Sequence, residues 1–301
     1  MKKCGTVTII GRPNVGKSTL LNTLIGEKIA IVSPKPQTTR NRITGILTRD
    51  EVQFIFTDTP GIHRSGSKLG DMMMRSIYDS VSGVDVALLV ADADKLPGRP
   101  EKILLERVAQ AELPCVLALN KTDSVQKPEI LPIIAAYSTL YDFAAIIPIS
   151  AKTGDGTEVL LEEISALLPE QEHIFPDDAL TDQPERVLAA ELVREQLMLR
   201  LEKEIPHGVA CETERFEERE DGITEIDVLI VCDKPNHKSI IIGKQGSMLR
   251  TVGSLSRINI EKMLGTQVFL QLWVKVKEDW KNSASFLSEL SSLSDPDAII
   301  E

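Results

Sequence analysis

The first half of the chain alternates between short apolar runs and stretches whose apolar residues recur with a helical period. Continuous apolar runs predict strands that are buried on both faces, and the helical stretches predict crossovers between them. This alternation is typical of an α/β domain with a mostly parallel sheet flanked by helices. The predicted strands are 6–10, 53–57, 84–91, 115–119 and 144–149, and the predicted helices include 19–25, 101–110 and 158–168. A charged pair between 45–48 and 53–57 also predicts a hairpin, and hence one antiparallel edge strand.

The second half has a different order of elements. Residues 170–184 contain prolines, adjacent aspartates and little helical period, which predicts a linker or an extended connection. After it we expect a helix, two strands, two short helices, a strand and a final helix, which together predict a small α+β domain. The expected bounds are 185–204, about 209–217, about 224–231, about 238–242, about 247–264 and about 267–276. The expected domains are therefore 1–169 and 185–301, the second with a C-terminal tail.

The composition excludes several classes of protein. A chain of 301 residues, 42% hydrophobic and 26% charged, is typical of a globular protein of two domains, and not of a disordered chain, a collagen or a polytopic membrane protein. No run approaches the roughly 18 apolar residues that span a bilayer. The apolar run after the basic start is too short for the core of a secretory signal. The four cysteines are scattered without metal-ligand spacing, so we expect reduced thiols in a cytosolic protein.

The charge is distributed unevenly along the chain. The total of −11 argues against a nucleic-acid partner, but 1–169 is balanced, 170–233 carries a net −13 and 234–281 a net +6. Affinity for phosphate groups depends on local charge rather than on the total. A basic block is also typical of an ordinary solvated surface. Charge alone therefore does not show whether 234–281 binds phosphate groups, and the motifs in it must be considered.

Residues 11–18 read Gly-Arg-Pro-Asn-Val-Gly-Lys-Ser and lie between a predicted strand and a predicted helix. In this context the pattern GxxxxGK[ST] is a phosphate loop, whose glycines let backbone N–H groups and a helix N-terminus converge on phosphate oxygens. We expect Lys17 to bridge the β- and γ-phosphates and Ser18 to ligate Mg²⁺. The predicted phosphate-binding residues are Gly11, Arg12, Pro13, Asn14, Val15, Gly16, Lys17, Ser18 and Thr19.

A second motif, Asp-Thr-Pro-Gly, follows the next apolar strand. A carboxylate at this place can hold Mg²⁺ through water, and the Gly61 amide can reach the γ-phosphate. The predicted residues at the γ-phosphate are Asp58, Thr59, Pro60, Gly61 and Ile62.

Two further motifs at strand ends favour guanine. One carboxylate, that of Asp123, can accept hydrogen bonds from both the N1–H and the 2-amino group of guanine, a donor pair that adenine lacks. The Lys121 stem can lie over the purine, and a backbone N–H of 150–152 can meet guanine O6. Four motifs at the carboxyl ends of strands predict one nucleotide site and a GTPase rather than an ATPase. The predicted guanine-binding residues are Asn120, Lys121, Asp123, Ser150, Ala151 and Lys152.

The stretch Pro-Gln-Thr-Thr-Arg at 36–40 lies between the first two motifs. A threonine hydroxyl here is expected to complete the Mg²⁺ shell only when a γ-phosphate is present, so that this loop reports GTP against GDP. We favour Thr39 over Thr38 for this role. The predicted Mg²⁺ ligands are therefore Ser18, Thr39 and, through water, Asp58.

The hydrolytic step has no obvious catalyst in the sequence. Many GTPases place a glutamine directly after the Asp-Thr-Pro-Gly motif to orient the attacking water, whereas this chain has Ile62. Isoleucine neither donates nor accepts, so intrinsic hydrolysis should be slow or be helped by another group. His63 can be that group or an ordinary loop histidine. Arg40 and Arg42 are open between an arginine finger, neighbours of the phosphate loop and RNA contacts.

The basic block contains a helix-GxxG-helix pattern at 239–250. Two glycines let a nucleic-acid backbone pass close, and the apolar residues 240–242 can line a groove for unstacked bases, although we expect at least one of these isoleucines to fill the core instead. The α-β-β-α-α-β order is that of a KH domain, which favours RNA over the alternatives of a protein or an anionic lipid. The predicted RNA-binding residues are Lys238, Ile241, Ile242, Gly243, Lys244, Gln245, Gly246 and Arg250.

Together these segments resemble the bacterial Era GTPase family, and the resemblance rests on GRPNVGKSTLLN, SPKPQTTRNRI, DTPGIH, NKTD, SAK, HKSIIIGKQGSMLRTVG and LQLWVKVKEDW. It implies a GTPase, using GTP/GDP and Mg²⁺, fused to a type II KH domain. It also implies binding to small-subunit ribosomal RNA near its 3′ end, and a role in maturation of the 30S subunit. A cytoplasmic protein, partly peripheral at the inner membrane, is implied as well, and we expect a monomer. Gln245 departs from the family, where a small residue is common, and the acidic tail after Trp280 is longer than the resemblance implies.

Overall fold

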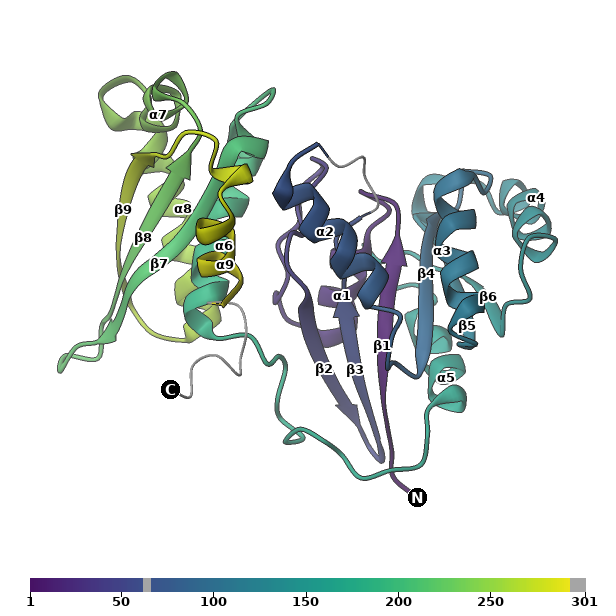
Figure 1. The fold of residues 1–301 in the computed structure, drawn as a ribbon. Coiled ribbons are helices and arrows are strands. Elements are labelled where there is room, and N and C mark those ends of the chain that lie inside the picture. The colour runs from purple at the N-terminus through teal and green to yellow at the C-terminus, as the bar shows by residue number, and fades with distance from the viewer. Residues whose placement is uncertain (62–65, 293–301) are drawn as a thin grey trace. The chain divides into compact units, whose positions relative to one another are not determined.

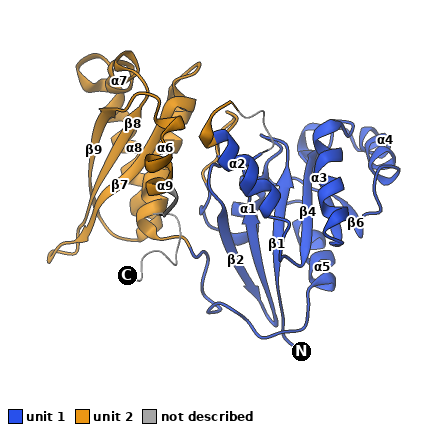
Figure 2. Ribbon diagram, viewed as in Figure 1, with its two compact units in different colours: residues 1–30, 39–65, 70–182 blue, residues 31–38, 66–69, 183–301 orange. Residues whose placement is uncertain are grey.

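The computed structural model describes residues 1–61 and 66–292, which are drawn in Figure 1. The chain divides into two compact units, coloured separately in Figure 2. Unit 1 comprises Met1–Ala30, Thr39–Ser65 and Gly70–Asp182, and unit 2 comprises Ile31–Thr38, Gly66–Leu69 and Gln183–Glu301. The units are therefore not two contiguous stretches of sequence, because short segments from the first half belong with unit 2.

Unit 1 is built on a six-stranded sheet of order β2-β3-β1-β4-β5-β6. Only β2 runs antiparallel to its neighbour, β3, and the other adjacent pairs are parallel. This confirms the predicted α/β class and the predicted antiparallel edge strand. The strands are β1 (Lys3–Gly11), β2 (Ile43–Arg49), β3 (Val52–Asp58), β4 (Val86–Asp92), β5 (Cys115–Asn120) and β6 (Ala145–Pro148).

Helices cover both faces of this sheet, which explains why its strands are apolar throughout. Successive side chains of a strand point to opposite faces. Leu88 and Val90 of β4 pack with residues of α1 and α5, whereas Ala87 and Leu89 pack with residues of α2, α3 and α4. The helices are α1 (Lys17–Ile25), α2 (Lys68–Asp79), α3 (Arg99–Gln110), α4 (Lys127–Ser138) and α5 (Thr157–Leu167).

Unit 2 has the predicted order α-β-β-α-α-β and a three-stranded sheet of order β7-β8-β9. Strands β7 and β8 are antiparallel, and β8 and β9 are parallel. The strands are β7 (Val209–Glu218), β8 (Thr224–Cys232) and β9 (Val268–Val276), and the helices are α6 (Glu185–Arg200), α7 (Pro235–Ile242), α8 (Ser247–Leu264) and α9 (Ala284–Ser292). Short 3-10 turns lie at Thr122–Ser124 in unit 1 and at Pro206–Gly208, Lys244–Gly246 and Trp280–Asn282 in unit 2.

The sheet of unit 2 also buries both faces. Val228 and Ile230 of β8 belong to a core with residues of α6, α7 and α8. On the other face, Val231 packs with Trp280 and Phe286. The indole N–H of Trp280 donates to the carbonyl oxygen of Gly208 at 3.0 Å, which satisfies the one polar atom of a fully buried ring.

Several element bounds differ from the sequence predictions, and the end of α6 is one of them. Helix α6 ends at Arg200, not at residue 204, because Leu201 takes an extended conformation as the C-cap. Much of the predicted linker 170–184 is bound to unit 1. The side-chain oxygen of Gln53 in β3 accepts the N–H groups of Ile174 and Phe175, each at 2.9 Å, so this segment is a connection held against the sheet, the second of the two predicted alternatives.

Candidate functional site

The phosphate loop connects the end of β1 to the start of α1, as the motif predicts. Gly16 is the N-cap of α1 and has a φ of 100°, which a side chain rarely adopts. A Cβ at this position would also collide with the side-chain amide of Asn120. Glycine is therefore required here both by the backbone conformation and by the close approach of the guanine motif.

Lys17 is buried at the base of the loop, where it is only 6% exposed. Its ammonium donates to the carbonyl oxygens of Gly11 and Arg12 at 3.4 and 3.2 Å. Burial lowers the pKa of Lys17, and the negative charge of Asp58 opposes that shift. A cation held in such a place is stabilised by any additional negative charge, such as a phosphate group.

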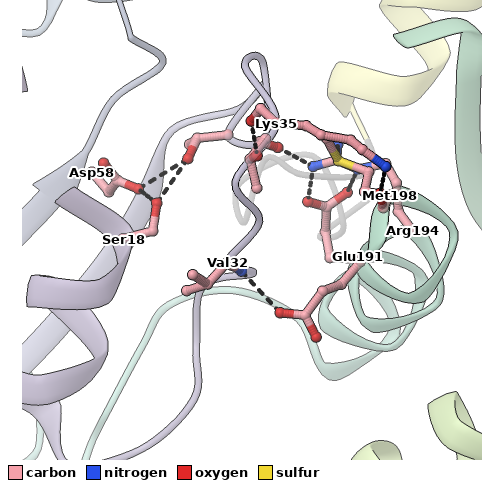
Figure 3. Close-up of polar contacts among 10 residues, drawn as sticks. Ser18, Val32, Lys35, Asp58, Glu191, Arg194 and Met198 are labelled. Carbon is pink, nitrogen blue, oxygen red and sulfur yellow. Dashed lines mark hydrogen bonds and ion pairs between the residues drawn. The ribbon is translucent and has the colours of Figure 1, made fainter. Parts of the chain in front are cut away.

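Three oxygen atoms from three segments converge beside the loop. The Ser18 hydroxyl donates to Asp58 Oδ2 at 2.6 Å and lies 2.9 Å from Thr39 Oγ1, which itself donates to Asp58 at 3.1 Å (Figure 3). Burial raises the pKa of the Asp58 carboxyl, while Lys17 and the hydroxyl donors lower it. Two hydroxyls and a carboxylate form the hard oxygen set that suits Mg²⁺, so the residues fit the predicted metal.

The structure distinguishes between the two candidate threonines. Thr39 is 7% exposed and its hydroxyl belongs to this oxygen cluster. The Thr38 hydroxyl instead donates to the carbonyl oxygen of Lys35 at 2.7 Å. The geometry therefore favours Thr39, as the sequence analysis does.

The Asp-Thr-Pro-Gly motif ends β3 against the phosphate loop. The Thr59 hydroxyl donates to the Ile9 carbonyl oxygen at 2.9 Å. A Cβ at Gly61 would lie 2.6 Å from the Pro13 nitrogen, so only glycine allows the two loops to approach so closely. Ile62, His63 and Arg64, which follow, lie outside the described residues.

The guanine motifs at the ends of β5 and β6 are joined to the phosphate loop by Asn120. Its Nδ2 donates to the Val15 carbonyl oxygen at 2.8 Å, and its Oδ1 accepts the Ala151 N–H at 2.8 Å. Because Asn120 is 3% exposed, one buried amide connects the phosphate loop to the 150–152 turn. Asn120 is therefore a joint between two parts of the site, and its predicted contact with guanine stays a prediction.

Of the other guanine-site residues, Ser150 and Ala151 are buried, Lys121 is partly exposed, and Asp123 and Lys152 are exposed. Ser150 donates its hydroxyl to Asp123 Oδ1 at 2.8 Å, which orients a carboxylate that otherwise faces solvent. Both residues line a cavity of about 360 Å³ between this turn and α4. Lys121 donates to the Asn14 carbonyl oxygen at 2.7 Å, so its side chain crosses the phosphate loop, and Lys152 is exposed.

The sequence analysis missed Asp92. This buried carboxylate ends β4 and pairs with Lys121 at 2.7 Å and also with Lys95. Burial acts to raise the pKa of Asp92, but the two lysines outweigh it and lower the pKa. An acidic residue at the end of an apolar strand is the same signal that identified Asp58, so it was available in the sequence.

Arg42 was left open in the sequence analysis between an arginine finger, a neighbour of the phosphate loop and an RNA contact. In the structure its guanidinium donates to the Thr57 hydroxyl of β3 at 3.2 Å.

The GxxG loop in unit 2 turns sharply between α7 and α8. Gly243 and Gly246 have φ values of 75° and 77°, and Gln245 shares this left-handed region at 51°. A Cβ at Gly243 would lie 2.7 Å from that of Met248, whereas a Cβ at Gly246 would meet nothing within 4 Å. Gly243 therefore allows the helices to pack, and Gly246 presents open backbone to solvent.

The predicted RNA-binding residues divide into two groups. Lys244, Gln245 and Arg250 are exposed, and Lys238, Ile242, Gly243 and Gly246 are partly exposed. Ile241 is wrong as a groove residue, because it is fully buried in the core between the helices and the sheet. The helical turn of α7 instead exposes its neighbour Ile240, at 46%.

Comparisons with known proteins agree with both the nucleotide site of unit 1 and the KH-like order of unit 2. The 50S ribosome-binding GTPase family matches residues 6–121, and the KH domain family matches residues 204–281. GTPase Era of Ruminiclostridium cellulolyticum is 50% identical over 96% of this chain and 97% of its own length. The chain belongs to the Era GTPase family. It is accordingly a GTPase.

Other Era GTPases and their structures extend the comparison. GTPase Era of Geobacter metallireducens is 46% identical over 96% of this chain and 97% of that protein. A crystal structure of an Aquifex aeolicus Era variant bound to GDP and AlF₄⁻ has a TM-score of 0.92 and 37% identity, covering 98% of this chain and 99% of that one. An Era structure with MgGDPNP and nucleotides 1506–1542 of 16S ribosomal RNA has the same TM-score, identity and coverage.

The family match shows the fold and the activity. Whether a helix could span a membrane is a separate question. Across the part of the chain that the structure describes, no helix combines the length and the apolar character needed to cross a bilayer.

Proposed function

We propose that this Era-family GTPase uses Mg²⁺ and GTP to control binding of small-subunit ribosomal RNA, near the RNA's 3′ end, during maturation of the 30S subunit. The observation that carries the nucleotide half is the convergence of Ser18, Thr39 and Asp58 within 3.1 Å of one another, beside the buried Lys17. The related Era structure that contains MgGDPNP and a 16S ribosomal RNA fragment supports both halves.

In this proposal each part of the site has one task. Bound Mg²⁺ would neutralise charge on the phosphates. Ser18, Thr39 and Asp58 would hold it, the backbone of the phosphate loop and Lys17 would bind the phosphates, and Asp123 would accept both guanine donors. Because isoleucine at position 62 cannot orient water, we expect slow intrinsic hydrolysis. A monomeric protein of the cytoplasm, partly at the inner membrane face, is expected from the family resemblance alone.

The RNA half rests on the open face of the GxxG loop. Gly246 has open space where its side chain would be, and the exposed Lys244 and Arg250 flank it in the basic stretch 234–281. A backbone that no described residue covers allows the sugar-phosphate chain to approach, and the two cations can contact its phosphates. Only the buried Ile241 falls out of the predicted set.

The experiment compares two matched glycine variants. Gly246→Asp places a negative charge at the proposed phosphate path. Gly222→Asp places the same charge in the β7–β8 turn, where φ is 78° against 77° at Gly246 and the space is also open. RNA affinity is measured at fixed salt with a single-stranded oligonucleotide of the 16S 3′ end and with a scrambled one. We expect Gly246→Asp to lose at least about tenfold, the loss that one charged hydrogen bond explains, and Gly222→Asp to bind as wild type.

The competing partners give different results. Equal binding of RNA by wild type and Gly246→Asp would contradict the proposed RNA groove. Loss of binding to vesicles that contain anionic lipid, with RNA binding unchanged, would favour a membrane partner for the same loop. Equal affinity for the 3′-end and scrambled oligonucleotides would contradict the proposed specificity.

A further inference from the structure

The segment 31–38, which leads to the switch threonine, belongs to unit 2 although residues on both sides of it belong to unit 1. Three of its residues make polar contacts with α6, the first helix of unit 2, or with the residue that caps it (Figure 3). The contacts join its beginning, its middle and its last residue to that helix. A loop held in three places has few alternative conformations, so its attachment to α6 restricts the residue that follows it.

The first contact uses the backbone of the loop, and the second uses the end of the helix. The Val32 N–H donates to Glu195 Oε1 at 2.9 Å. The Lys35 ammonium donates to the carbonyl oxygens of Met198 and Leu201, at the C-terminal end of α6. The last carbonyl groups of a helix lack partners within it and carry partial negative charge, so a lysine here is bound by both effects.

The third contact is made by Arg194, whose guanidinium donates to the Thr38 carbonyl oxygen. The Arg194 side chain is only 2% exposed. Its Nε and Nη2 atoms also donate to the two carboxylate oxygens of Glu191, at 2.7 and 2.5 Å. Burial by itself would lower the pKa of Arg194, but the charge of Glu191 and these hydrogen bonds raise it.

A buried guanidinium is costly unless its donors find acceptors. Glu191 lies one turn away on the same helix and satisfies part of the group. The contact to Thr38 is the one that leaves the helix and fixes the loop. Arg194 is therefore arranged to hold a backbone carbonyl, and that carbonyl belongs to the residue directly before Thr39.

We propose that Arg194 is a positioning residue of the nucleotide switch: by holding the Thr38 carbonyl oxygen, it fixes the peptide bond that places the Thr39 hydroxyl beside Ser18 and Asp58. This inference rests on the proposed role of Thr39 as a ligand in the GTP state. The contact to α6 lies within unit 2 and the oxygen cluster within unit 1, and the peptide bond between Thr38 and Thr39 joins them. The coupling is reciprocal: if the contact between Arg194 and Thr38 strengthens GTP binding by some factor, bound GTP strengthens that contact by the same factor.

The proposal is tested by measuring nucleotide affinities, without RNA. Arg194→Met removes the donors but keeps an unbranched stem in the buried site. The matched control is Arg186→Met on the same helix, because Arg186 also donates to a backbone carbonyl, that of Thr213 in β7, at 2.8 Å. Titrations with fluorescent GDP and with a fluorescent non-hydrolysable GTP analogue, both with Mg²⁺, give two affinities for each protein.

We expect Arg194→Met to bind the GTP analogue about tenfold more weakly, the loss of roughly one hydrogen bond to a charged group, and to bind GDP as wild type. Arg186→Met should change neither affinity. Arg194→Lys, which keeps one donor, should recover part of the loss. Lys35→Met tests the same attachment from the loop side, without altering the interior of α6, and should change the ratio of the two affinities in the same direction.

Three outcomes would overturn the proposal. They are an unchanged affinity ratio in both Arg194→Met and Lys35→Met, an equal loss of GDP and analogue affinity, and the same change of ratio in Arg186→Met. None of these measurements involves RNA, so a failure of the proposed RNA function is seen separately with the oligonucleotides. RNA affinity then adds a second readout, because the difference between GDP and the analogue should shrink in Arg194→Met.

Discussion

Asn120 is predicted to hold the two loops of the nucleotide site together. Its side-chain amide makes two buried hydrogen bonds of 2.8 Å, one to the Val15 carbonyl oxygen in the phosphate loop and one from the Ala151 N–H in the guanine turn. Asn120→Ala removes both and leaves a buried acceptor and a buried donor without these partners. The two loops are then no longer fixed at one distance from each other.

The magnitude follows from the two unsatisfied groups. A buried polar group that loses its partner costs about 1–3 kcal/mol. Two such groups give about 2–4 kcal/mol in the free energy of unfolding, if relaxation recovers part of the larger sum. GDP contacts both loops in the proposed site, so its affinity should fall at least about tenfold, which corresponds to about 1.4 kcal/mol.

The assay pairs urea unfolding without nucleotide with GDP titration, and the control is Asn22→Ala. Asn22 also joins two segments, since it donates to the Ala30 carbonyl oxygen at 2.7 Å and accepts the Ile29 and Ala30 N–H groups at 3.0 and 2.9 Å. Asn22→Ala should lose a similar free energy of unfolding with GDP affinity retained. If Asn120→Ala is destabilised but binds GDP as tightly as wild type, Asn120 does not act as a joint.

Two further predictions concern base choice and pH. Asp123→Asn replaces a double acceptor with a group that also donates. GTP affinity should therefore fall at least tenfold, as expected for a charged hydrogen bond worth about 1.5–3 kcal/mol, and xanthine-nucleotide affinity should rise. Unchanged GTP affinity in the same titration would contradict the assignment. Burial raises the pKa of Cys115 to about 12 from 9.0, so the stability that this thiol contributes is complete below pH 9 and lost as the pH rises towards 12. Between pH 8 and 10.5, wild type should lose about 2 kcal/mol more than Cys115→Ala in urea unfolding, and equal losses would contradict the shift.

Much of unit 1 was predictable because its chemistry lies at the ends of apolar strands. Asp58 and Asn120 are the last residues of β3 and β5, and the phosphate loop begins where β1 ends. Parallel strands bring their carboxyl ends to one edge, so residues distant in sequence meet there. The same rule applies to Asp92 at the end of β4, and it was missed only because no familiar motif contains it.

Other details depend on packing that the sequence does not specify. The three isoleucines at 240–242 are chemically alike, and their exposure depends on which side of α7 faces the sheet. The structure buries Ile241 completely and leaves Ile240 46% exposed. Similarly, Gln53 reads as a polar interruption of an apolar strand, yet it accepts two N–H groups from the predicted linker. A hydrogen bond to a distant backbone has no sequence signature.

The attachment of 31–38 to α6 shows the same limit most clearly. Arg194 and Lys35 each look like ordinary surface charges, and the groups they bind are backbone carbonyls some 160 positions away in the chain. One general signal does exist, because α6 buries ten of its sixteen residues, among them Arg194, Glu195 and Gln196. The apolar residues of α6 pack in one core with residues of α8 and of the sheet of unit 2. Buried polar residues need hydrogen-bonding partners, and those that the structure gives Arg194 and Glu195 include backbone groups of the segment that leads to the nucleotide switch.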